Sequence, residues 1–343
     1  MTASVSSPTV TRADWPTTFR SVLADVLQRG EKVTAGEGLS IGGGRTSREL
    51  LNHTYTLAQP HDRLVSGPGI PFNLHAAVGR FVWMMAGDDR LSSIEFYDAR
   101  ARLFSDDGLT VPGSSDGHRL INPRPGLNQL DRVVDLLASE PGTRRAAASI
   151  YHPEDAGRVS RDIPCHIAVA YNRRHNALHA TTMMRSCNAA RVLPYDFFLF
   201  SLLAEYVARR IGADPGTYTQ FTASMHVYEE DLGTAAEAAS STVEDSQPKM
   251  APMPADDPAA CVAGLVRVEE AIRLSVPSAD RRWVRRHEAV IADTLPDYWQ
   301  DFGRVLLMHA IRRSTLADGE KAELSMDVGS RLSAPFRRSV EYA

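Results

Sequence analysis

Three kinds of reactive side chain occur within 33 residues, from Pro164 to Asp196. Cys165 could act as a nucleophile, because a thiolate attacks electron-poor carbon. Arg185 and Ser186 could hold an anion, because a guanidinium presents a planar fork of donors. Asp196 could accept hydrogen bonds from a polar ligand. The stretch therefore combines a nucleophile, an anion-binding pair and a polar recognition group.

A predicted β-hairpin brings these side chains together. Two runs of alternating polar and apolar residues, 165–171 and 177–184, are separated by a polar turn. Paired strands lie within about 5 Å of each other, so the start of the first strand and the end of the second face one cleft. Residues 193–196 then open a long apolar helix. We expect the thiol, the arginine–serine pair and the acid to line the same site.

Each of these side chains also has a purely structural explanation. A cysteine in a strand is commonly a small buried hydrophobe, and an acid just before a helix is a common N-cap. An arginine–serine pair is equally compatible with a surface ion pair. His166 points to the opposite strand face from Cys165, so it is a poor general base for that thiol, and His226 is the other candidate. The residues alone leave these alternatives open.

Composition excludes several classes of protein. The 343-residue chain has a net charge of −4 at pH 7, whereas proteins that bind nucleic-acid polymers usually have a basic excess. Its three cysteines are too few and too irregular for a disulfide framework or a structural zinc site. The N-terminus lacks the apolar core of a signal peptide, and the most apolar helix, 197–208, is too short to span a membrane. We expect a cytoplasmic protein with no metal, membrane or nucleic-acid polymer as partner.

Hydrophobic periodicity predicts an α+β protein with a C-terminal helical extension. The polar residues 1–13 are expected to form a disordered tail. Residues 232–258, small, polar and rich in proline, are expected to form a linker or mobile loop. The catalytic core would then span 14–231 and the helical extension 259–343. Further expected elements are helices at 15–29, 72–86, 127–139, 195–211, 259–274, 279–295 and 297–316, and strands at 50–57, 146–151 and 217–228.

Arginines occur at two further places that could meet an anion. A glycine-rich loop over residues 36–48 carries Arg45 and Arg48. It fails the P-loop pattern, because no lysine follows the glycines at the required position, so it is either a flexible connection or a basic loop that closes over a phosphate. The adjacent Arg144 and Arg145 enter a predicted strand, where both can reach one ligand only at an irregular strand start.

Four motifs follow the order and spacing of the thymidylate synthase family, which the sequence resembles. They are Pro164-Cys165-His166, Arg185-Ser186-Cys187-Asn188, Leu193-Pro194-Tyr195-Asp196 and His226-Val227-Tyr228. The resemblance is close over residues 125–231, weak over 15–120 and absent over 232–343. The combined motifs are specific, although none alone would be. The resemblance implies the family's mixed sheet packed with helices.

The resemblance also implies a role for each matched residue. Cys165 would add as a thiolate to C6 of a pyrimidine nucleoside monophosphate. That addition would make C5 a nucleophile toward the one-carbon unit of 5,10-methylenetetrahydrofolate, while His166 would order water near the ring. The implied ligands of the phosphate and the sugar are Arg45 (with Arg48 as its rival), Arg144 and Arg145 from the second subunit of a homodimer, Arg185, Ser186, His226 and Tyr228.

Departures from the family pattern bear on the substrate. The family's asparagine that pairs with the uracil edge is Asp196 here, a third candidate catalytic residue. A carboxylate accepts from the amino group of cytosine but repels the carbonyl of uracil. One unmatched buried contact costs about 1–3 kcal/mol, which is ten- to hundredfold in specificity. Asn188 stands at the position of the folate-contacting acid, and Tyr97 replaces a tryptophan near the cleft. Arg80 stands at the position of the family's catalytic glutamate, and we expect Glu95 to take over the role of that glutamate.

These departures predict a cytidylate 5-hydroxymethyltransferase, with CMP favoured over dCMP. Water would add to the one-carbon unit in place of a hydride, which a looser cleft would favour. CMP enzymes of this family serve nucleoside-antibiotic biosynthesis, and the alanine- and arginine-rich composition is typical of a bacterial chain. The motifs do not decide between ribose and deoxyribose. The alternatives are a thymidylate synthase-like methylation of dUMP or UMP, and a nucleotide-binding relative that has lost catalysis through Arg80.

Overall fold

The computed structural model describes residues 9–12, 14–36, 43–64, 72–241 and 249–341. A mixed sheet forms one layer of the structure. Its strands are β1 (Thr9–Arg12), β2 (Glu31–Thr34), β3 (Thr46–Leu57), β4 (Ala147–Ser149), β5 (His166–Arg174), β6 (Ala177–Met184), β7 (Cys187–Asn188) and β8 (Asp214–Tyr228). Their order is β1-β3-β8-β6-β5-β4, with β2 paired to β3 and β7 paired to β8. The β5–β6 pair is the predicted hairpin, and β6 runs parallel to β8.

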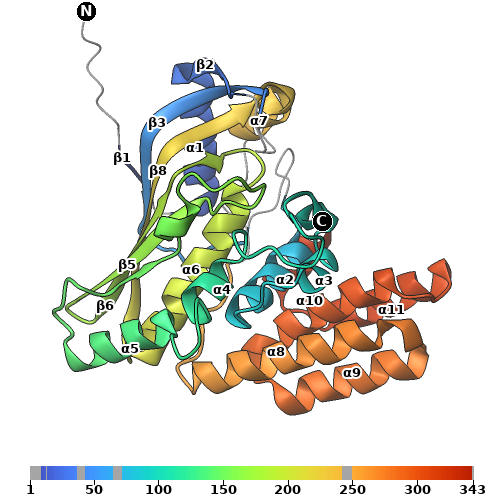
Figure 1. Cartoon of the computed structure of the whole chain (residues 1–343). Coiled ribbons are helices and arrows are strands. Elements are labelled where there is room, and N and C mark those ends of the chain that lie inside the picture. The colour runs from blue at the N-terminus through green and yellow to red at the C-terminus, as the bar shows by residue number, and fades with distance from the viewer. Residues whose placement is uncertain (1–8, 13, 37–42, 65–71, 242–248, 342–343) are drawn as a thin grey trace, which may run out of the picture.

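Helices α1 (Trp15–Arg29) and α6 (Leu193–Arg210) cover one face of this sheet (Figure 1). Alternate residues of a strand point to opposite faces, and β6 alternates strictly between buried and half-buried side chains. The buried set faces the two helices. The other face keeps half-exposed side chains, Met183 of β6 and Phe221 of β8 among them.

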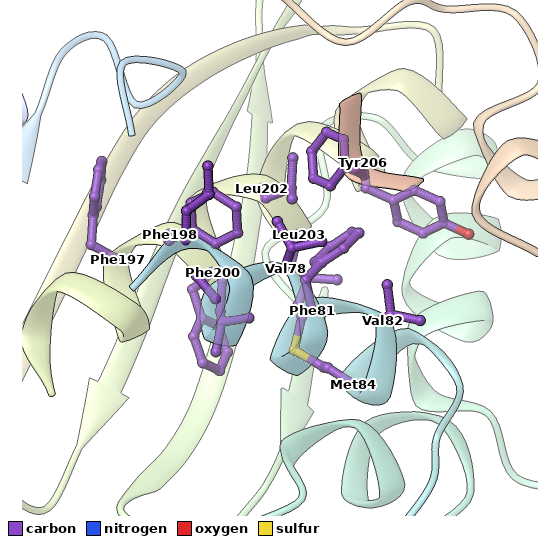
Figure 2. Close-up of a cluster of buried hydrophobic side chains, with 14 of the residues drawn as sticks. Val78, Phe81, Val82, Met84, Phe197, Phe198, Phe200, Leu202, Leu203 and Tyr206 are labelled. Carbon is purple, nitrogen blue, oxygen red and sulfur yellow. The ribbon is translucent and has the colours of Figure 1, made fainter. Parts of the chain in front are cut away.

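Helix α6 is buried around its whole circumference over residues 196–208. The sheet packs on one side of it and α2 (Leu74–Met85) on another. Figure 2 shows the apolar side chains of α2 and α6 gathered in one cluster. Burying a large apolar side chain contributes about 1.5–3 kcal/mol, so this packing holds the first turn of α6, and Asp196 with it, in one position.

The remaining helices connect or extend this core. They are α3 (Leu91–Glu95), the 3-10 helix η1 (Ala99–Leu103), α4 (Asp116–Ile121), α5 (Gln129–Ser139), α7 (Leu232–Ser240), α8 (Pro258–Ser275), α9 (Arg281–Thr294), α10 (Asp297–Arg313), α11 (Asp318–Ser330) and α12 (Ala334–Glu341). Helices α8, α10 and α12 contact α2, and His75 of α2 donates its Nδ1–H to the carbonyl of Val305 (2.9 Å). Within the described parts of the chain, none of the helices is both long and apolar enough to cross a membrane.

The observed architecture confirms the predicted α+β fold, while two segments differ from the expectation. Residues 9–12, expected in a disordered tail, form β1 parallel to β3; residues 1–8 and 13 lie outside the described residues. The expected linker begins with α7, because the alanines Ala235 and Ala238 form a small buried face against α1. Helices α11 and α12 lie in the expected helical extension, after its last individually expected helix at 297–316.

A buried ion pair holds the later part of the expected linker. Arg63 is 0% exposed, and its Nη2 donates to Glu205 of α6 (2.6 Å). The other carboxylate oxygen of Glu205 accepts the backbone N–H of Met253 (2.7 Å). Residues around Met253 are therefore packed on α6 instead of forming a loose connection.

Arg63→Met is expected to lower the free energy of unfolding by about 3–5 kcal/mol, because it leaves Glu205 buried without its counter-charge. Urea unfolding measures this loss. The double variant Arg63→Met/Glu205→Gln removes both charges, so it should recover part of the stability. A loss below about 1 kcal/mol in the single variant, the range of an exposed pair, would contradict this role.

Candidate active site

The hairpin places Arg185 directly against Cys165. Cys165 precedes β5, Arg185 follows β6, and the backbone N–H of Arg185 donates to the carbonyl of Cys165 (2.8 Å). The guanidinium Nη2 lies 3.7 Å from the Cys165 Sγ. Cys165 is an exposed residue with a free thiol, yet the protein packed around it raises the pKa of that thiol, and Arg185 opposes the rise. The arginine therefore favours the thiolate, the reactive form.

Asp196 lies inside helix α6 and is not its N-cap. The helix begins at Leu193 after Val192, so Asp196 is its fourth residue. Its buried carboxyl has Oδ2 3.5 Å from the Cys187 Sγ and Oδ1 3.8 Å from the His166 Nε2. Burial raises the pKa of Asp196 to about 6, although His166 opposes the rise. The N-cap explanation is excluded, and the buried carboxyl lies beside the Cys187 thiol and the His166 imidazole.

Asp116 is a residue of this site that the sequence did not reveal. It begins α4, where Ser115 is the N-cap, and its Oδ1 lies 3.1 Å from the Nδ1 of His166. The next residue, Gly117, lets α4 approach α2: a Cβ there would stand 1.9 Å from the carbonyl oxygen of Met84. Burial lowers the pKa of His166, but Asp116 and Asp196 outweigh it, and the net pKa of the imidazole is raised.

A second cluster lies where β7 and β3 flank the end of β8. Asn188 of β7 and Glu49 of β3 both pair with His226. The Ser186 hydroxyl is 3.4 Å from the His226 Nδ1, and the rings of His226 and Tyr228 lie 4.9 Å apart. Ser186, His226 and Tyr228, predicted to bind the phosphate and the sugar, are therefore neighbours, and Asn188, predicted to contact folate, lies beside them.

The structure separates the two rival arginines of the glycine-rich loop. The Arg45 guanidinium lies 3.5 Å above the Tyr228 ring and forms an ion pair with Glu230. Arg48 instead donates to the carbonyl of Gly30 (3.2 Å), at the end of α1. Arg45 is thus the one beside the predicted sugar ligands; residues 37–42 of the loop lie outside the described residues.

The pair Arg144 and Arg145 lies toward the opposite end of β5 from Cys165. Ala147 pairs with Ala170, five residues along the chain from the thiol, which is roughly 16 Å at 3.3 Å per residue. Both arginines are exposed. Within one chain they are not brought to the site, and their role across a homodimer interface stays a prediction.

Tyr97 and Asn188, the two residues expected to contact folate, form hydrogen bonds within the protein. The Tyr97 hydroxyl donates to Glu269 of α8 (2.9 Å). The Asn188 Oδ1 accepts the backbone N–H groups of Ala190 and Arg191 (3.0 and 3.1 Å) and so shapes the turn before α6. These contacts give Tyr97 and Asn188 structural roles, and their contact with folate stays a prediction.

The position of the family's catalytic glutamate and its expected substitute both carry ion-paired side chains. Arg80 forms an ion pair with Asp98 (2.5 Å), and Glu95 forms one with Arg102 (2.7 Å). Burial raises the pKa of Asp196, and the charge of Arg80 is among the effects that oppose this rise. Among the described residues, no group of three or more histidines, cysteines and acids is placed to hold a metal ion.

The chain is similar in sequence to a family model and to several known proteins. The family model described as thymidylate synthase matches residues 74–258, which carries the match past residue 231 to the start of α8. A deoxyuridylate hydroxymethyltransferase of Bacillus phage SP01 is 28% identical over 229 residues, covering 63% of this chain and 57% of that protein. A putative thymidylate synthase of Methanosarcina barkeri is 34% identical over 115 residues, covering 34% of this chain and 52% of that protein. The chain spans about half the length of these curated relatives.

The fold gives an independent comparison. A solved structure of the thermostable thymidylate synthase A from Bacillus subtilis superposes with a TM-score of 0.57 at 15% identity, covering 67% of this chain and 85% of that chain. At this identity the likeness bears on the fold alone, and it agrees with the mixed sheet and helices described above. With the family model matching more than half of its residues, the chain belongs to the thymidylate synthase family.

Proposed function

We propose that the chain transfers a hydroxymethyl group to C5 of a cytidylate, using 5,10-methylenetetrahydrofolate and water. The buried carboxyl of Asp196 is the observation that carries this proposal. An ionised carboxyl accepts from the amino group of cytosine, and a proton shared with the carboxyl adds a hydrogen bond to N3. The same ionised carboxyl repels the carbonyl that uracil presents in place of the amino group. Each unmatched buried contact costs about 1–3 kcal/mol.

Cys165 and Arg185 would begin the reaction. The Cys165 thiolate would add to C6 of the pyrimidine, and the guanidinium 3.7 Å from its sulfur would favour the ionised thiol. The guanidinium is held in place, because its Nε and Nη2 donate to the carbonyls of Pro164 (2.7 Å) and Ile163 (3.0 Å). Cys187, the other thiol near Asp196, is buried and its pKa is raised, first by burial and then by Asp196, so it is the poorer nucleophile.

The nucleotide's phosphate and sugar would occupy the second cluster. We place the 5′-phosphate at Arg185, Ser186 and Arg45, and the sugar hydroxyls at His226 and Tyr228. The stacking of Arg45 on the Tyr228 ring would hold these two groups side by side. The motifs do not distinguish ribose from deoxyribose. CMP is favoured because the alanine- and arginine-rich composition is typical of a bacterial chain, and CMP enzymes of the family serve nucleoside-antibiotic biosynthesis.

A homodimer would complete the phosphate site with Arg144 and Arg145 from the second copy. The exposure of these arginines supports this assembly, and so does the half-exposed sheet face that includes Met183 and Phe221. We propose a cytoplasmic enzyme that acts on a free nucleotide, without a nucleic-acid polymer or a membrane.

Methylenetetrahydrofolate would supply the one-carbon unit, as it does in the thymidylate synthase family. Tyr97 and Asn188 are the residues proposed to meet it. Their hydroxyl and amide oxygen are engaged by Glu269 and by the turn before α6, so folate would contact the Tyr97 ring edge and the Asn188 amide group.

Hydroxymethylation of deoxyuridylate is the second candidate. The phage SP01 protein named deoxyuridylate hydroxymethyltransferase favours it, as does a protein of the same name from Pseudomonas phage M6, 30% identical over 158 residues and covering 45% of this chain and 44% of that protein. Both candidates share water addition and differ in the base edge that meets Asp196.

A substrate panel separates the candidates. The protein is incubated with methylenetetrahydrofolate and with CMP, dCMP, UMP or dUMP, and the products are followed by mass spectrometry. CMP is expected to gain one CH2O unit with release of tetrahydrofolate. Turnover of the uracil nucleotides alone would overturn the proposal, and dihydrofolate among the products would identify a methylating enzyme. Retention of tritium at C5 of every nucleotide would identify a binder without catalysis.

CMP binding is expected to weaken as the pH rises above about 6. Burial raises the pKa of Asp196 to about 6, and the proton shared with cytosine N3 is lost above that pH, by up to roughly tenfold in affinity per pH unit. Calorimetry on Cys165→Ala protein measures this without thiol titration. The double variant Cys165→Ala/Asp196→Asn controls for titration of the phosphate; identical pH profiles for the two proteins would contradict the shared proton.

A further inference from the structure

Three carboxylates surround Cys165, and two of them already have other tasks. Burial raises the pKa of the Cys165 thiol, and Asp196, Asp116 and Asp162 add to that rise. Asp162 accepts the backbone N–H of Gly113 and a hydroxyl hydrogen bond (both 2.5 Å), which ties the loop before α4 to the strand that carries the thiol. Asp196 is committed to the base edge under the proposed function. Asp116 is the one of these three carboxylates that has no task assigned above.

Asp116 is also the most accessible of the carboxylates that contact His166. Its side chain is 13% exposed, compared with 7% for His166 and 7% for Asp196. One of its oxygens, Oδ1, faces the Nδ1 of His166 at 3.1 Å. The second oxygen is therefore available to a water molecule, because an ionised carboxylate has acceptor sites on both oxygens.

His166 is fixed on every side except one. Its ring packs 4.3 Å from the Phe200 ring, its Nδ1 faces Asp116, and its buried Nε2 has no hydrogen-bond partner and lies 3.8 Å from Asp196. A buried polar atom without a partner costs about 1–3 kcal/mol, and a bound base or an ordered water would relieve that cost. The imidazole thus stands between Asp116 on its Nδ1 side and Asp196 on its Nε2 side, and it is the residue next to Cys165 in the chain.

The reaction needs a base that the expected positions do not supply. Water addition requires that a proton leave the attacking water, and a positioned carboxylate contributes about 10²–10⁴-fold to such a step. The family's glutamate is replaced by Arg80, which is paired with Asp98, and Glu95 is paired with Arg102. Asp116 comes from a different element, α4, and reaches the same site.

We propose that Asp116 is the catalytic base that activates the water in the final step of the reaction. This assignment rests on the proposed hydroxymethyl transfer. The water oxygen forms a bond to the one-carbon unit on C5, and its proton passes to the free oxygen of Asp116. Once C5 has lost its proton and tetrahydrofolate has left, the one-carbon unit is joined to C5 by a double bond. As water adds, the π pair of that bond moves into the ring, restores the C5–C6 double bond and expels the Cys165 sulfur from C6 as a thiolate, while the single bond from C5 to the new CH2OH group remains. His166, whose Nδ1 lies 3.1 Å from the other oxygen of Asp116, holds the carboxyl in place.

Asp116→Asn tests this assignment against a merely orienting role. The amide oxygen still accepts from the His166 Nδ1–H, so an orienting residue would survive the change, whereas a base would not. We expect kcat for the hydroxymethyl nucleotide to fall about 10²-fold with KM for the nucleotide changed less than threefold. Tritium release from C5 should continue. Added 2-mercaptoethanol should be captured on the one-carbon unit as a thioether at near the wild-type rate, because a thiolate needs no base.

A second histidine–aspartate pair, which includes another residue of α4, provides the control. His118 of α4 lies 3.9 Å from Asp89, so Asp89→Asn makes the same change outside the site and should leave kcat unaltered. Thermal unfolding of both variants shows whether either has lost its fold. Full hydroxymethyl formation by Asp116→Asn would overturn the assignment, as would equal loss of the thioether and the hydroxymethyl product.

The same assays keep the two proposals apart. They are run on whichever nucleotide the wild-type protein converts, so turnover of a uridylate alone defeats the cytidylate proposal while still testing Asp116. If wild-type protein releases dihydrofolate and no hydroxymethyl product, no water is added. Both the proposed hydroxymethyl transfer and the role of Asp116 are then wrong. If wild-type protein hydroxymethylates CMP and Asp116→Asn does so equally well, only the role of Asp116 falls.

Discussion

Cys165→Ala is expected to lower kcat by a factor on the order of 10⁴ or more, the scale reached when a covalent nucleophile is removed. Without the sulfur, C6 gains no substituent and C5 stays too electron-poor to attack the one-carbon unit. Product formation and tritium release from C5 should be lost together, because both follow the attack on C6. Nucleotide binding should persist, since Arg185, Ser186 and His226 are unchanged.

Cys261 offers the matched control for this variant. It is a free cysteine of α8, partly exposed, and lies outside the site, so Cys261→Ala should keep full activity. Denaturing mass spectrometry of the wild-type protein with nucleotide and folate should detect a covalent complex that Cys165→Ala cannot form. Retained turnover in Cys165→Ala would rule out the covalent mechanism, whichever base is the substrate.

Asp196→Asn is expected to shift the preference from cytidylate toward uridylate by a factor of about 10–10² in the ratio of the two kcat/KM values. The carboxylate repels the uracil carbonyl, whereas an asparagine amide donates to it. The amide also pairs with cytosine, so the shift comes from the one contact restored to uracil, about 1–3 kcal/mol. The ratio is measured with CMP and UMP competing in one reaction. An unaltered ratio would mean that the carboxyl does not face the base, whatever its effect on the total rate.

The same variant should be more stable than the wild-type protein. The pKa of Asp196 rises from its ordinary 3.8 to about 6 in the folded state, so the folded protein binds this proton more tightly than the unfolded chain. Stability is therefore lost as the pH rises through that window, and the loss is complete above it, at about 3 kcal/mol. Asp196→Asn should recover up to that amount at neutral pH, while Asp116→Asn provides a comparison at a neighbouring carboxyl. A less stable Asp196→Asn protein would argue that the acid is a structural element of α6.

Local patterns explain why the proximity of several candidate residues could be predicted from the sequence. Alternation over β5 and β6 fixed which strand ends meet, and so placed Cys165 beside Arg185. The structure also decided alternatives that the pattern left open: α6 begins at Leu193, which excludes Asp196 as its cap, and Arg48 turns back to Gly30 while Arg45 meets Tyr228.

Contacts between distant segments could not be predicted in this way. Asp116 and His166 are 50 residues apart in the chain. The polar sequence around Asp116 indicates only a turn, whereas Asp116 begins α4. Tyr97 was expected at the cleft from its position in the family pattern, but its hydroxyl partner is Glu269 on a helix that the resemblance did not cover. Helix α7 was not predicted, because its buried face consists of alanines, which give only a weak hydrophobic pattern.

A crystal structure of Cys165→Ala protein with bound CMP measures the geometry on which the substrate assignment depends. The amino nitrogen of cytosine is expected within about 3 Å of an Asp196 carboxyl oxygen, with the 5′-phosphate at Arg185 and Ser186. A base turned so that its amino group lies on another side chain, with Asp196 beyond hydrogen-bond distance, would contradict the assignment of cytidylate as the substrate.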